Sequence, residues 1–249
     1  MATGGDRPSE RRGAARTAVV WDALRAVLGD ATLDGEAVRD VVDIGGGTGG
    51  FAVRAAELGH RVVVVDPSPD ALAALDRRAQ ERGLADRVTA LQGDLSGVVD
   101  LLGADAADVV LCHGVLEVVD DPAGALAAIA GVLRPHGAVS LLVAQRHAAV
   151  IARAMAGHFQ QARALLDQTD PGGRAGRRFT REELTALVSA VGLSVTAVHA
   201  VRVFSDLVPG SLLDLEPGAT QALVELEQAV AERPEYLPLA TQLHLLARR

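Results

Sequence analysis

The sequence predicts an α/β fold built on a doubly wound sheet of seven strands, mostly parallel, with an antiparallel edge strand. Two observations lead to this prediction. From residue 38 to residue 144, short apolar runs alternate with helical patterns, which is typical of parallel strands joined by crossover helices. Beyond residue 190, two strand-like segments flank one helical pattern, and we expect them to pair antiparallel at the edge of the sheet.

The parallel part of the sheet is expected to follow a single helix. Residues 1–13 are polar, with Gly, Pro and mixed charge, and indicate a disordered N-terminus. Apolar residues at helical spacing predict a helix over 14–28. A helix opening at Pro122 precedes the last parallel strand, with a break at 135–137 between them. The five parallel strands are expected at 38–44, 61–66, 88–95, 108–113 and 138–144.

The second half of the chain changes pattern but adds no linker. We therefore expect one domain, 14–249, with a helical insertion at about 146–178 over the ligand edge, ending in a loop rich in Gly and Arg at 169–178. Thr180-Arg181-Glu182-Glu183 resembles a capping box that opens a helix. The elements expected here are helices at 148–157, 160–167, 180–191 and 219–232, and strands at 193–204 and 238–247.

Composition narrows the function classes. Of the 249 residues, 49% are apolar but only 2% are aromatic, so the core must be packed from Ala, Val and Leu. All 24 basic residues are arginine, and the absence of lysine excludes Schiff-base chemistry and a P-loop lysine. The single cysteine, Cys112, excludes an intramolecular disulfide. No metal is expected, because the seven histidines lack the close spacing of a zinc site.

Charge and hydropathy bear on partners and location. The net charge is −8, whereas dedicated DNA-binding proteins are usually basic, so no DNA partner is expected. No apolar run approaches membrane-spanning length, and the N-terminus has no hydrophobic signal core. We therefore expect a soluble, cytoplasmic protein without membrane contact.

The chain is organised around residues 41–50, Val-Val-Asp-Ile-Gly-Gly-Gly-Thr-Gly-Gly. An apolar strand runs into a glycine cluster and a helical pattern follows at 51–58, which predicts strand, tight turn and helix. Glycine can adopt a positive φ in the turn, and without a Cβ it lets a ligand lie against the backbone. The free N–H groups at the start of the helix then face that ligand. The loop therefore predicts a site for a nucleotide-like cofactor.

Asp43, at the end of the strand, discriminates between the possible cofactors. Gly45, Gly47 and Gly50 satisfy the dinucleotide pattern G-x-G-x-x-G, but a pyrophosphate in this turn would be repelled by the nearby Asp43 carboxylate. S-adenosylmethionine has no phosphate, and its ammonium group can donate a charge-assisted hydrogen bond to that carboxylate. S-adenosylmethionine is therefore the predicted cofactor. The alternative is a plain glycine turn with Asp43 as a helix-side cap.

Two further acids end strands of the predicted sheet. Asp66 closes the second strand about twenty residues after the first glycine, where a ribose diol is held in dinucleotide folds. Asp94 follows the third strand. Asp66 could instead cap the next helix through Pro67-Ser68-Pro69, and Asp94 could close a turn.

Asp43 to Gly49, Asp-x-Gly-x-Gly-x-Gly, resembles motif I of the class I S-adenosylmethionine-dependent methyltransferases, whose Rossmann-like fold agrees with the predicted sheet. Residues 113–118 and 133–137 are similar to the motif around the fourth strand of that superfamily. Nearly the whole chain also resembles one family within it, the bacterial tRNA 5-carboxymethoxyuridine methyltransferases, which esterify the carboxylate of a modified wobble uridine. The matching blocks are 16–24, 113–117, His147, 155–159, 201–206, 223–227 and the ending around His244.

This resemblance implies roles for individual residues. Arg16 contacts the cofactor carboxylate, Asp66 holds the ribose hydroxyls, and His113 sits beside the sulfonium. The remaining candidates lie under the methionine moiety or frame the adenine. Arg16 could instead be a solvated helix charge, and His113 an ordinary strand-end histidine. The candidate cofactor-binding residues are Arg16, Asp43, Gly45, Gly46, Gly47, Gly49, Asp66, Pro67, Asp94, Leu95 and His113.

The resemblance implies a carboxylate on tRNA as methyl acceptor, and a small molecule is the alternative. A carboxylate is ionised at neutral pH and needs no general base, but a guanidinium helps to bind it. Arg146, His147 and Arg202 are the substrate-side candidates, and no catalytic residue is assigned. Ala144 to His147 replaces a Tyr-Asn-Ala-His run of the family, and 172–178 lacks the family's lysines, which predicts fewer phosphate contacts.

Two other function classes stay open. A nicotinamide-dependent oxidoreductase could use the same scaffold, but Asp43 and the absence of any Tyr-x-x-x-Lys pair argue against it. A non-catalytic methyltransferase-like subunit could bind a cofactor or partner without turnover. The retained glycine motif and both strand-end acids argue against that class.

Overall fold

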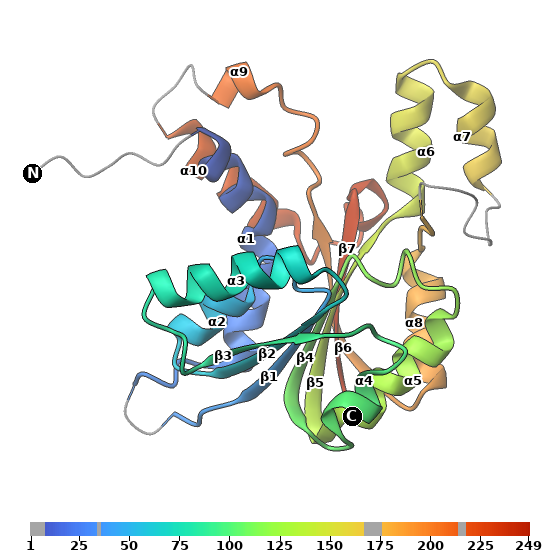
Figure 1. Cartoon of the computed structure of the whole chain (residues 1–249). Coiled ribbons are helices and arrows are strands. Elements are labelled where there is room, and N and C mark those ends of the chain that lie inside the picture. Colours follow the sequence, from blue (N-terminus) through green and yellow to red (C-terminus); the bar gives the residue numbers. More distant parts are fainter. Residues whose placement is uncertain (1–7, 34–35, 167–175, 214–217) are drawn as a thin grey trace, which may run out of the picture.

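In the computed structural model of this chain, one sheet of seven strands separates two layers of helices (Figure 1). The structure describes residues 8–33, 36–166, 176–213 and 218–249, with side chains from residue 17 onward. The strand order is β3-β2-β1-β4-β5-β7-β6. The strands are β1 (Asp40–Ile44), β2 (Arg61–Asp66), β3 (Val88–Gln92), β4 (Ala107–His113), β5 (Leu133–Ala144), β6 (Ser194–Val201) and β7 (Gln242–Arg248).

The pairing confirms the predicted doubly wound sheet. Strands β1 to β5 pair in parallel, and β7 is antiparallel to both of its neighbours, β5 and β6. The reversed strand therefore lies second from the edge, and β6 forms the edge itself. Because β6 is antiparallel to β7, it points the same way as β1 to β5. The carboxyl end of β6 therefore lies at the same end of the sheet as the carboxyl ends of β1 to β5.

Helices cover both faces of the sheet (Figure 1). Buried residues of α1, α2 and α3 pack on one face, and those of α4, α5 and α8 pack on the other. Helices α6 and α7 follow β5 and project beyond its carboxyl end (Figure 1). The helices are α1 (Pro8–Leu28), α2 (Ala52–Glu57), α3 (Pro69–Glu81), α4 (Val98–Leu102), α5 (Pro122–Val132), α6 (Arg146–Met155), α7 (Phe159–Leu166), α8 (Arg181–Ala190), α9 (Gly210–Leu213), α10 (Ala219–Val230) and the short 3-10 helix η2 (Leu237–Leu239).

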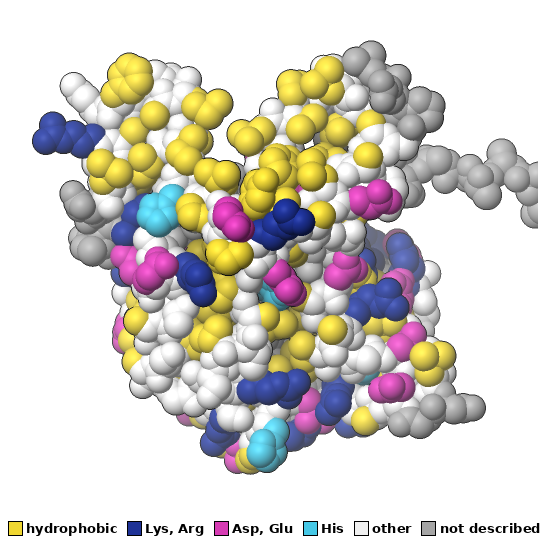
Figure 2. All heavy atoms as spheres, turned by 180° about the vertical axis from the view of Figure 1, so that it is seen from behind, with side chains coloured by type: hydrophobic (Ala, Val, Ile, Leu, Met, Phe, Trp, Pro, Cys, Tyr) yellow, Lys and Arg dark blue, Asp and Glu magenta, His cyan; other side chains and the backbone are white. Residues whose placement is uncertain are grey.

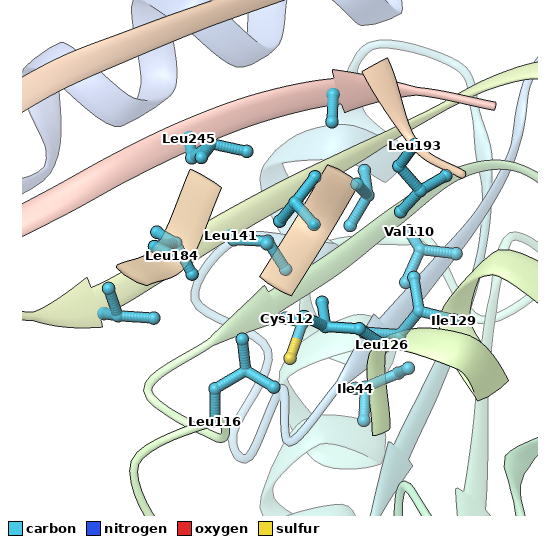
Figure 3. Close-up of a cluster of buried hydrophobic side chains, with 14 of the residues drawn as sticks. Ile44, Val110, Cys112, Leu116, Leu126, Ile129, Leu141, Leu184, Leu193 and Leu245 are labelled. Atoms are coloured by element: carbon cyan, nitrogen blue, oxygen red, sulfur yellow. The ribbon is translucent and has the colours of Figure 1, made fainter. Parts of the chain in front are cut away.

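The core is aliphatic, as the composition requires. Figure 3 shows Ile44, Leu126, Leu141 and Leu184 packed together from β1, α5, β5 and α8. Cys112 lies among them with no exposed surface, and burial raises the pKa of its thiol. This cysteine is therefore an inert core residue.

Helix starts follow the local sequence. Thr180 and Glu183 form the predicted capping box at the start of α8, each side chain accepting a backbone N–H of the other residue. Asp121 caps α5 by accepting the N–H groups of Ala123 and Gly124.

Several element boundaries differ from the sequence prediction; β3 and β6, for example, end earlier than predicted, at Gln92 and Val201. Helix α1 begins at Pro8, so residues 8–13, predicted to be disordered, are helical, and residues 1–7 lie outside the described residues. The predicted break at 135–137 is instead part of β5, whose register against β4 is irregular there, with His136 at φ 66°. Strand β7 starts only at Gln242, because Pro238 lies in η2 and offers no N–H for a sheet ladder.

Helices α6 and α7 lie where short helices were predicted over 148–157 and 160–167. Asp167 and residues 169–175 of the predicted loop lie outside the described residues. In the part of the chain that the structure describes, no helix has the length and apolar character needed to cross a membrane.

Candidate functional site

The glycine loop leaves the carboxyl end of β1 and enters α2. Gly45 has φ +67°, and a Cβ there would lie 2.4 Å from Cγ2 of Val115, in the segment after β4. Gly49 has φ +80°, and a Cβ there would lie 2.2 Å from Cδ1 of Leu75 in α3. Both positions therefore require glycine for conformation and for space. The loop is held close to its neighbours on both sides.

Asp43 lies buried beneath this loop. Asp43 is only 3% exposed, and a Cβ on Gly46 would come within 2.6 Å of the Asp43 carboxylate. Burial raises the pKa of Asp43 to about 7, and the nearby negative charge of Asp66 adds to the rise. A backbone hydrogen bond from Ala52 opposes the rise but does not cancel it. The ionised form of this carboxyl therefore gains strongly from any cation that enters the loop.

Asp66 ties the two cofactor-side loops together. Its Oδ2 accepts the N–H of Gly47 at 2.9 Å, and its Oδ1 accepts the N–H of Ser68 at 2.8 Å. Ser68, rather than Asp66, caps α3 by accepting the N–H of Ala71. Each carboxylate oxygen keeps a second lone pair that can accept a hydroxyl.

Asp94 closes a tight turn after β3. Its Oδ1 accepts the N–H groups of Ser96 at 2.9 Å and Gly97 at 3.2 Å, and the Ser96 hydroxyl also donates to it. The Ser96 side chain and the Gly97 N–H lower the pKa of Asp94. Asp94 is therefore ionised at neutral pH. Asp94 thus closes a turn and also lines a cavity between these loops and the segment after β4.

A cavity of about 750 Å³ connects these loops to the segment after β4. One wall carries Gly45, Asp66, Pro67, Asp94 and Leu95, all of which the sequence had proposed. Among its described lining residues, the ionisable ones are all acidic. The opposite wall was missed by the sequence reasoning, although a helix cap at the end of β4 could have pointed to it. That wall comprises Val115, Val118, Val119, Asp120, Asp121, Gly124, Ala125 and Ala128.

His113 stands at the carboxyl end of β4, beside the glycine loop. Its ring meets Phe51, the residue before α2, edge-on with 4.7 Å between ring centroids. Its Nε2 lies 2.8 Å from Oγ of Ser140, and its Nδ1 is buried without a hydrogen-bond partner among the described residues. Burial lowers the pKa of His113 to about 3, so the imidazole is neutral at neutral pH.

The structure does not gather the substrate-side candidates at one place, and the two arginines among them are paired with carboxylates of this chain. Arg146 is 8% exposed in its side chain, and both terminal nitrogens lie 2.8 Å from the Glu183 carboxylate of α8, with Nη2 also donating to the Arg178 carbonyl. It lines a separate hollow beside α8. His147 is exposed at the start of α6. Arg146 therefore fastens α6 to α8.

Arg202 follows β6 in a left-handed conformation with φ 61°. Its Nη2 lies 2.6 Å from the Asp206 carboxylate, which also accepts the Thr241 hydroxyl at 3.0 Å. A residue that the sequence reasoning did not assign holds this turn. The buried carboxylate of Glu227 in α10 accepts three successive N–H groups, those of Val203, Phe204 and Ser205, at 2.9, 3.0 and 2.7 Å.

Replacing Arg146 by Met is expected to lower the free energy of unfolding by about 1–3 kcal/mol, because a buried ion pair loses one partner. The expected loss of unfolding free energy is no larger because 36% of the Glu183 side-chain surface is exposed to water, which screens the ion pair. Urea unfolding measures the change, with the substitution of Arg153 by Met, at an exposed position of the same helix α6, as control. Unchanged stability together with lost turnover would instead place Arg146 on the substrate.

One candidate, Arg16, has no side-chain geometry in the structure. Arg16 falls within α1, but its side chain lies outside the described residues. Within the described ranges, no group of three His, Cys, Asp or Glu side chains is arranged to hold a metal ion.

Comparison with known proteins bears on this geometry. The family model described as "Methyltransferase domain" matches residues 42–141, from β1 to β5. The tRNA 5-carboxymethoxyuridine methyltransferase of Escherichia coli (strain K12) is 28% identical over 96% of this chain and 89% of its own length. The ubiquinone biosynthesis O-methyltransferase of Burkholderia thailandensis is 30% identical over 66% of this chain and 68% of its own length.

The fold is also shared with solved structures. An S-adenosylmethionine-dependent methyltransferase from Mesorhizobium loti superposes with a TM-score of 0.62 and 20% identity, covering 96% of this chain and 100% of that one. At this identity the likeness concerns the fold, which agrees with the observed strand order.

Proposed function

This chain belongs to the S-adenosylmethionine-dependent methyltransferases. We propose that it transfers the methyl group of S-adenosylmethionine to a hydroxyl oxygen of a small acceptor. The cofactor is S-adenosylmethionine. The acceptor is inferred from the ion pairs of Arg146 and Arg202, which carry the proposal.

The residues of the glycine loop fit a cationic, phosphate-free cofactor. Asp43 is a buried carboxylate with its pKa raised to about 7, and the cofactor's ammonium supplies the cation that it lacks. Asp66 would accept the ribose hydroxyls with its free lone pairs. Gly45 to Gly47 and Gly49 would leave room for the methionine part, while Pro67, Asp94 and Leu95 would frame the adenosine.

The remaining residues orient the reaction. When bound, the cofactor supplies an electrophilic methyl group on a sulfonium centre. The chain's contribution is alignment of an acceptor oxygen with that group, which can supply most of the acceleration. His113, neutral at the end of β4, would stand beside the sulfonium without repelling it. Arg16 in α1 remains the candidate partner of the cofactor carboxylate.

Neither of the two arginines predicted to bind the acceptor is free to pair with a carboxylate in the described structure. The guanidinium groups of Arg146 and Arg202 are each occupied by a carboxylate of this chain, Glu183 and Asp206. The described ionisable residues that line the cavity are acidic, and although this cavity is assigned to the cofactor, their negative charge also disfavours an anion beside it. A neutral acceptor avoids both costs.

Apolar surface beside the site favours the same kind of acceptor. Figure 2 shows hydrophobic side chains gathered on the projecting parts of the molecule, above its main body. On α6 and α7 the exposed large members are Ile151 (42%), Met155 (74%), Phe159 (70%) and Leu166 (56%), and α9 adds Leu212 (51%). An acceptor with an apolar body and a hydroxyl group suits these surroundings.

A carboxylate on tRNA is the second candidate. It is supported by the match to the Escherichia coli tRNA 5-carboxymethoxyuridine methyltransferase, which spans 96% of this chain and therefore includes α6, α7 and the last strands. This candidate needs Arg202 to exchange Asp206 for the acceptor. The two candidates give chemically different products, an ether and an ester.

Labelled methyl transfer separates them. The protein is incubated with methyl-labelled S-adenosylmethionine and either bulk bacterial tRNA or a small-molecule cell extract, and products are treated with mild alkali. We expect label in an alkali-stable, organic-soluble product, because methyl ethers resist hydrolysis. Label in RNA that alkali releases would contradict the hydroxyl acceptor and support the tRNA carboxylate. The Asp66→Asn variant provides the blank.

A further inference from the structure

Four neighbouring strands, β4, β5, β7 and β6, contribute one continuous row of polar side chains. From His113 on β4 the row passes to Ser140 on β5, with 2.8 Å between Nε2 and Oγ. Ser140 Oγ lies 2.8 Å from Nε2 of His244 on β7, and His244 Nδ1 lies 3.1 Å from Nδ1 of His199 on β6. Ser140 and His244 have no exposed surface, and His199 is 7% exposed.

The row ends at the protein surface. His199 Nε2 lies 3.5 Å from Oε1 of Glu232, just after α10, whose side chain is 81% exposed. Asp22 of α1 lines the same surface hollow as His199 and Glu232. His199 and His244 pair directly in the β6–β7 ladder, and their rings stack with 5.1 Å between centroids. The row therefore links the edge of the glycine loop to solvent through the interior of the sheet.

Hydrogen-bond chemistry gives the row a direction. An ionised Glu232 only accepts, so the proton of His199 belongs on Nε2, and His199 Nδ1 is then an acceptor. His244 therefore donates from Nδ1 and accepts the Ser140 hydroxyl at Nε2. The Ser140 oxygen in turn accepts from Nε2–H of His113. His113 Nδ1 is left as a bare lone pair.

That lone pair lacks a partner among the described residues, although it is buried. A buried polar atom without a hydrogen bond costs free energy and calls for an explanation. A bare imidazole nitrogen is completed by a donor, such as the O–H of a hydroxyl acceptor. A carboxylate offers no such donor at neutral pH.

We propose that His113, Ser140, His244 and His199 form a proton relay that removes the acceptor's hydroxyl proton and delivers a proton to Glu232. This inference rests on the proposed methyl transfer to a hydroxyl. As the oxygen–methyl bond forms and the carbon–sulfur bond breaks, with its electron pair remaining on sulfur, the O–H proton passes to His113 Nδ1.

The remaining transfers conserve protons along the row. His113 gives its Nε2 proton to Ser140, and Ser140 gives its hydroxyl proton to His244 Nε2. His244 gives its Nδ1 proton to His199, whose Nε2 proton leaves through Glu232 to water. Burial lowers the pKa of each histidine, so a proton does not rest on the buried rings.

Nitrogen-15 NMR of the histidine rings tests the relay in the cofactor-free protein. We expect the Nε2–H tautomer for His113 and His199 and the Nδ1–H tautomer for His244 at neutral pH. Glu232→Gln should shift the His113 ring nitrogens although it lies at the far end of the row. Glu225→Gln, which changes an exposed carboxylate in the preceding helix α10, should leave them unchanged.

Ser140→Ala supplies the second half of the test. With the hydroxyl removed, Glu232→Gln should no longer alter the His113 signals, while its effect on His199 remains. An Nδ1–H tautomer at His113 in the unmutated protein would overturn the relay. Unchanged chemical shifts of the His113 ring nitrogens in Glu232→Gln, with Ser140 present, would overturn the relay as well. Retained ring signals of His199 show that each variant is folded.

Turnover separates this inference from the proposed function. On the small-molecule fraction that yields the alkali-stable product, Ser140→Ala should lower kcat by about 100-fold with little change in KM, as loss of general-base assistance does. An alkali-stable product with unchanged kcat would refute the relay alone. An alkali-labile product would refute the hydroxyl acceptor, and with it the purpose of the relay.

Discussion

Replacing Asp66 by Asn is expected to weaken the binding of S-adenosylhomocysteine by about 100-fold, because charge-assisted hydrogen bonds to a ribose diol would be lost. The same carboxylate holds the N–H groups of Gly47 and Ser68 at 2.9 and 2.8 Å, so the amide also loosens both loops. The side-chain amide of Asn has a single oxygen that can accept a hydrogen bond, and its NH2 group would face a backbone N–H donor and repel it.

Isothermal titration calorimetry measures this affinity. Asp70→Asn is the matched control, since Asp70 lies in the first turn of the adjacent α3 and is exposed. Its affinity should equal that of the unmutated protein. If both variants bound the ligand equally well, Asp66 would not hold the ribose.

Exchanging Asp43 for Asn should stabilise the cofactor-free protein at neutral and higher pH. The pKa of this buried carboxyl is raised from 3.8 to about 7, so the folded state holds the proton more tightly than the unfolded chain. Stability is therefore fully present below the unfolded pKa and falls as pH rises toward 7. The loss is on the order of 4 kcal/mol above that range.

Thermal unfolding across pH checks the sign. The Asn variant should unfold at a higher temperature than the unmutated protein at about pH 8, and the difference should shrink as the pH falls to about 3, below the unfolded pKa of 3.8, where Asp43 is mostly protonated in both states. The same variant should lose cofactor affinity, because the amide cannot pair with an ammonium. A difference that grows on acidification would contradict the assigned charge state.

Much of this site could be predicted because it depends on the order of elements. A strand, a glycine turn and a helix bring Asp43, Gly45 and Gly49 to one edge, and parallel strands bring Asp66 and Asp94 to the same edge. These placements follow from topology. The geometry of Gly45 and Gly49 confirms that the turn leaves no room for a Cβ.

The remaining features depend on contacts between distant segments. Nothing near Arg146 in the sequence indicates that Glu183 binds it, and Glu227 holds the turn after β6 from a helix more than twenty residues away. The row from His113 to His199 arises only because β7 inserts between β5 and β6. The sequence predicted that the last two strands, β6 and β7, pair with each other, but not which side chains face one another along the row.

The central claim is that one buried carboxylate beneath the glycine loop selects a cationic cofactor over a phosphate-bearing one. Calorimetric titration with S-adenosylmethionine and with NAD, on the unmutated protein and on Asp43→Asn, tests it most directly. We predict binding of S-adenosylmethionine that strengthens from about pH 6 to about pH 8, no binding of NAD, and loss of the pH dependence in the variant. Binding of NAD by the unmutated protein, or an affinity for S-adenosylmethionine that Asp43→Asn leaves unchanged, would contradict the claim.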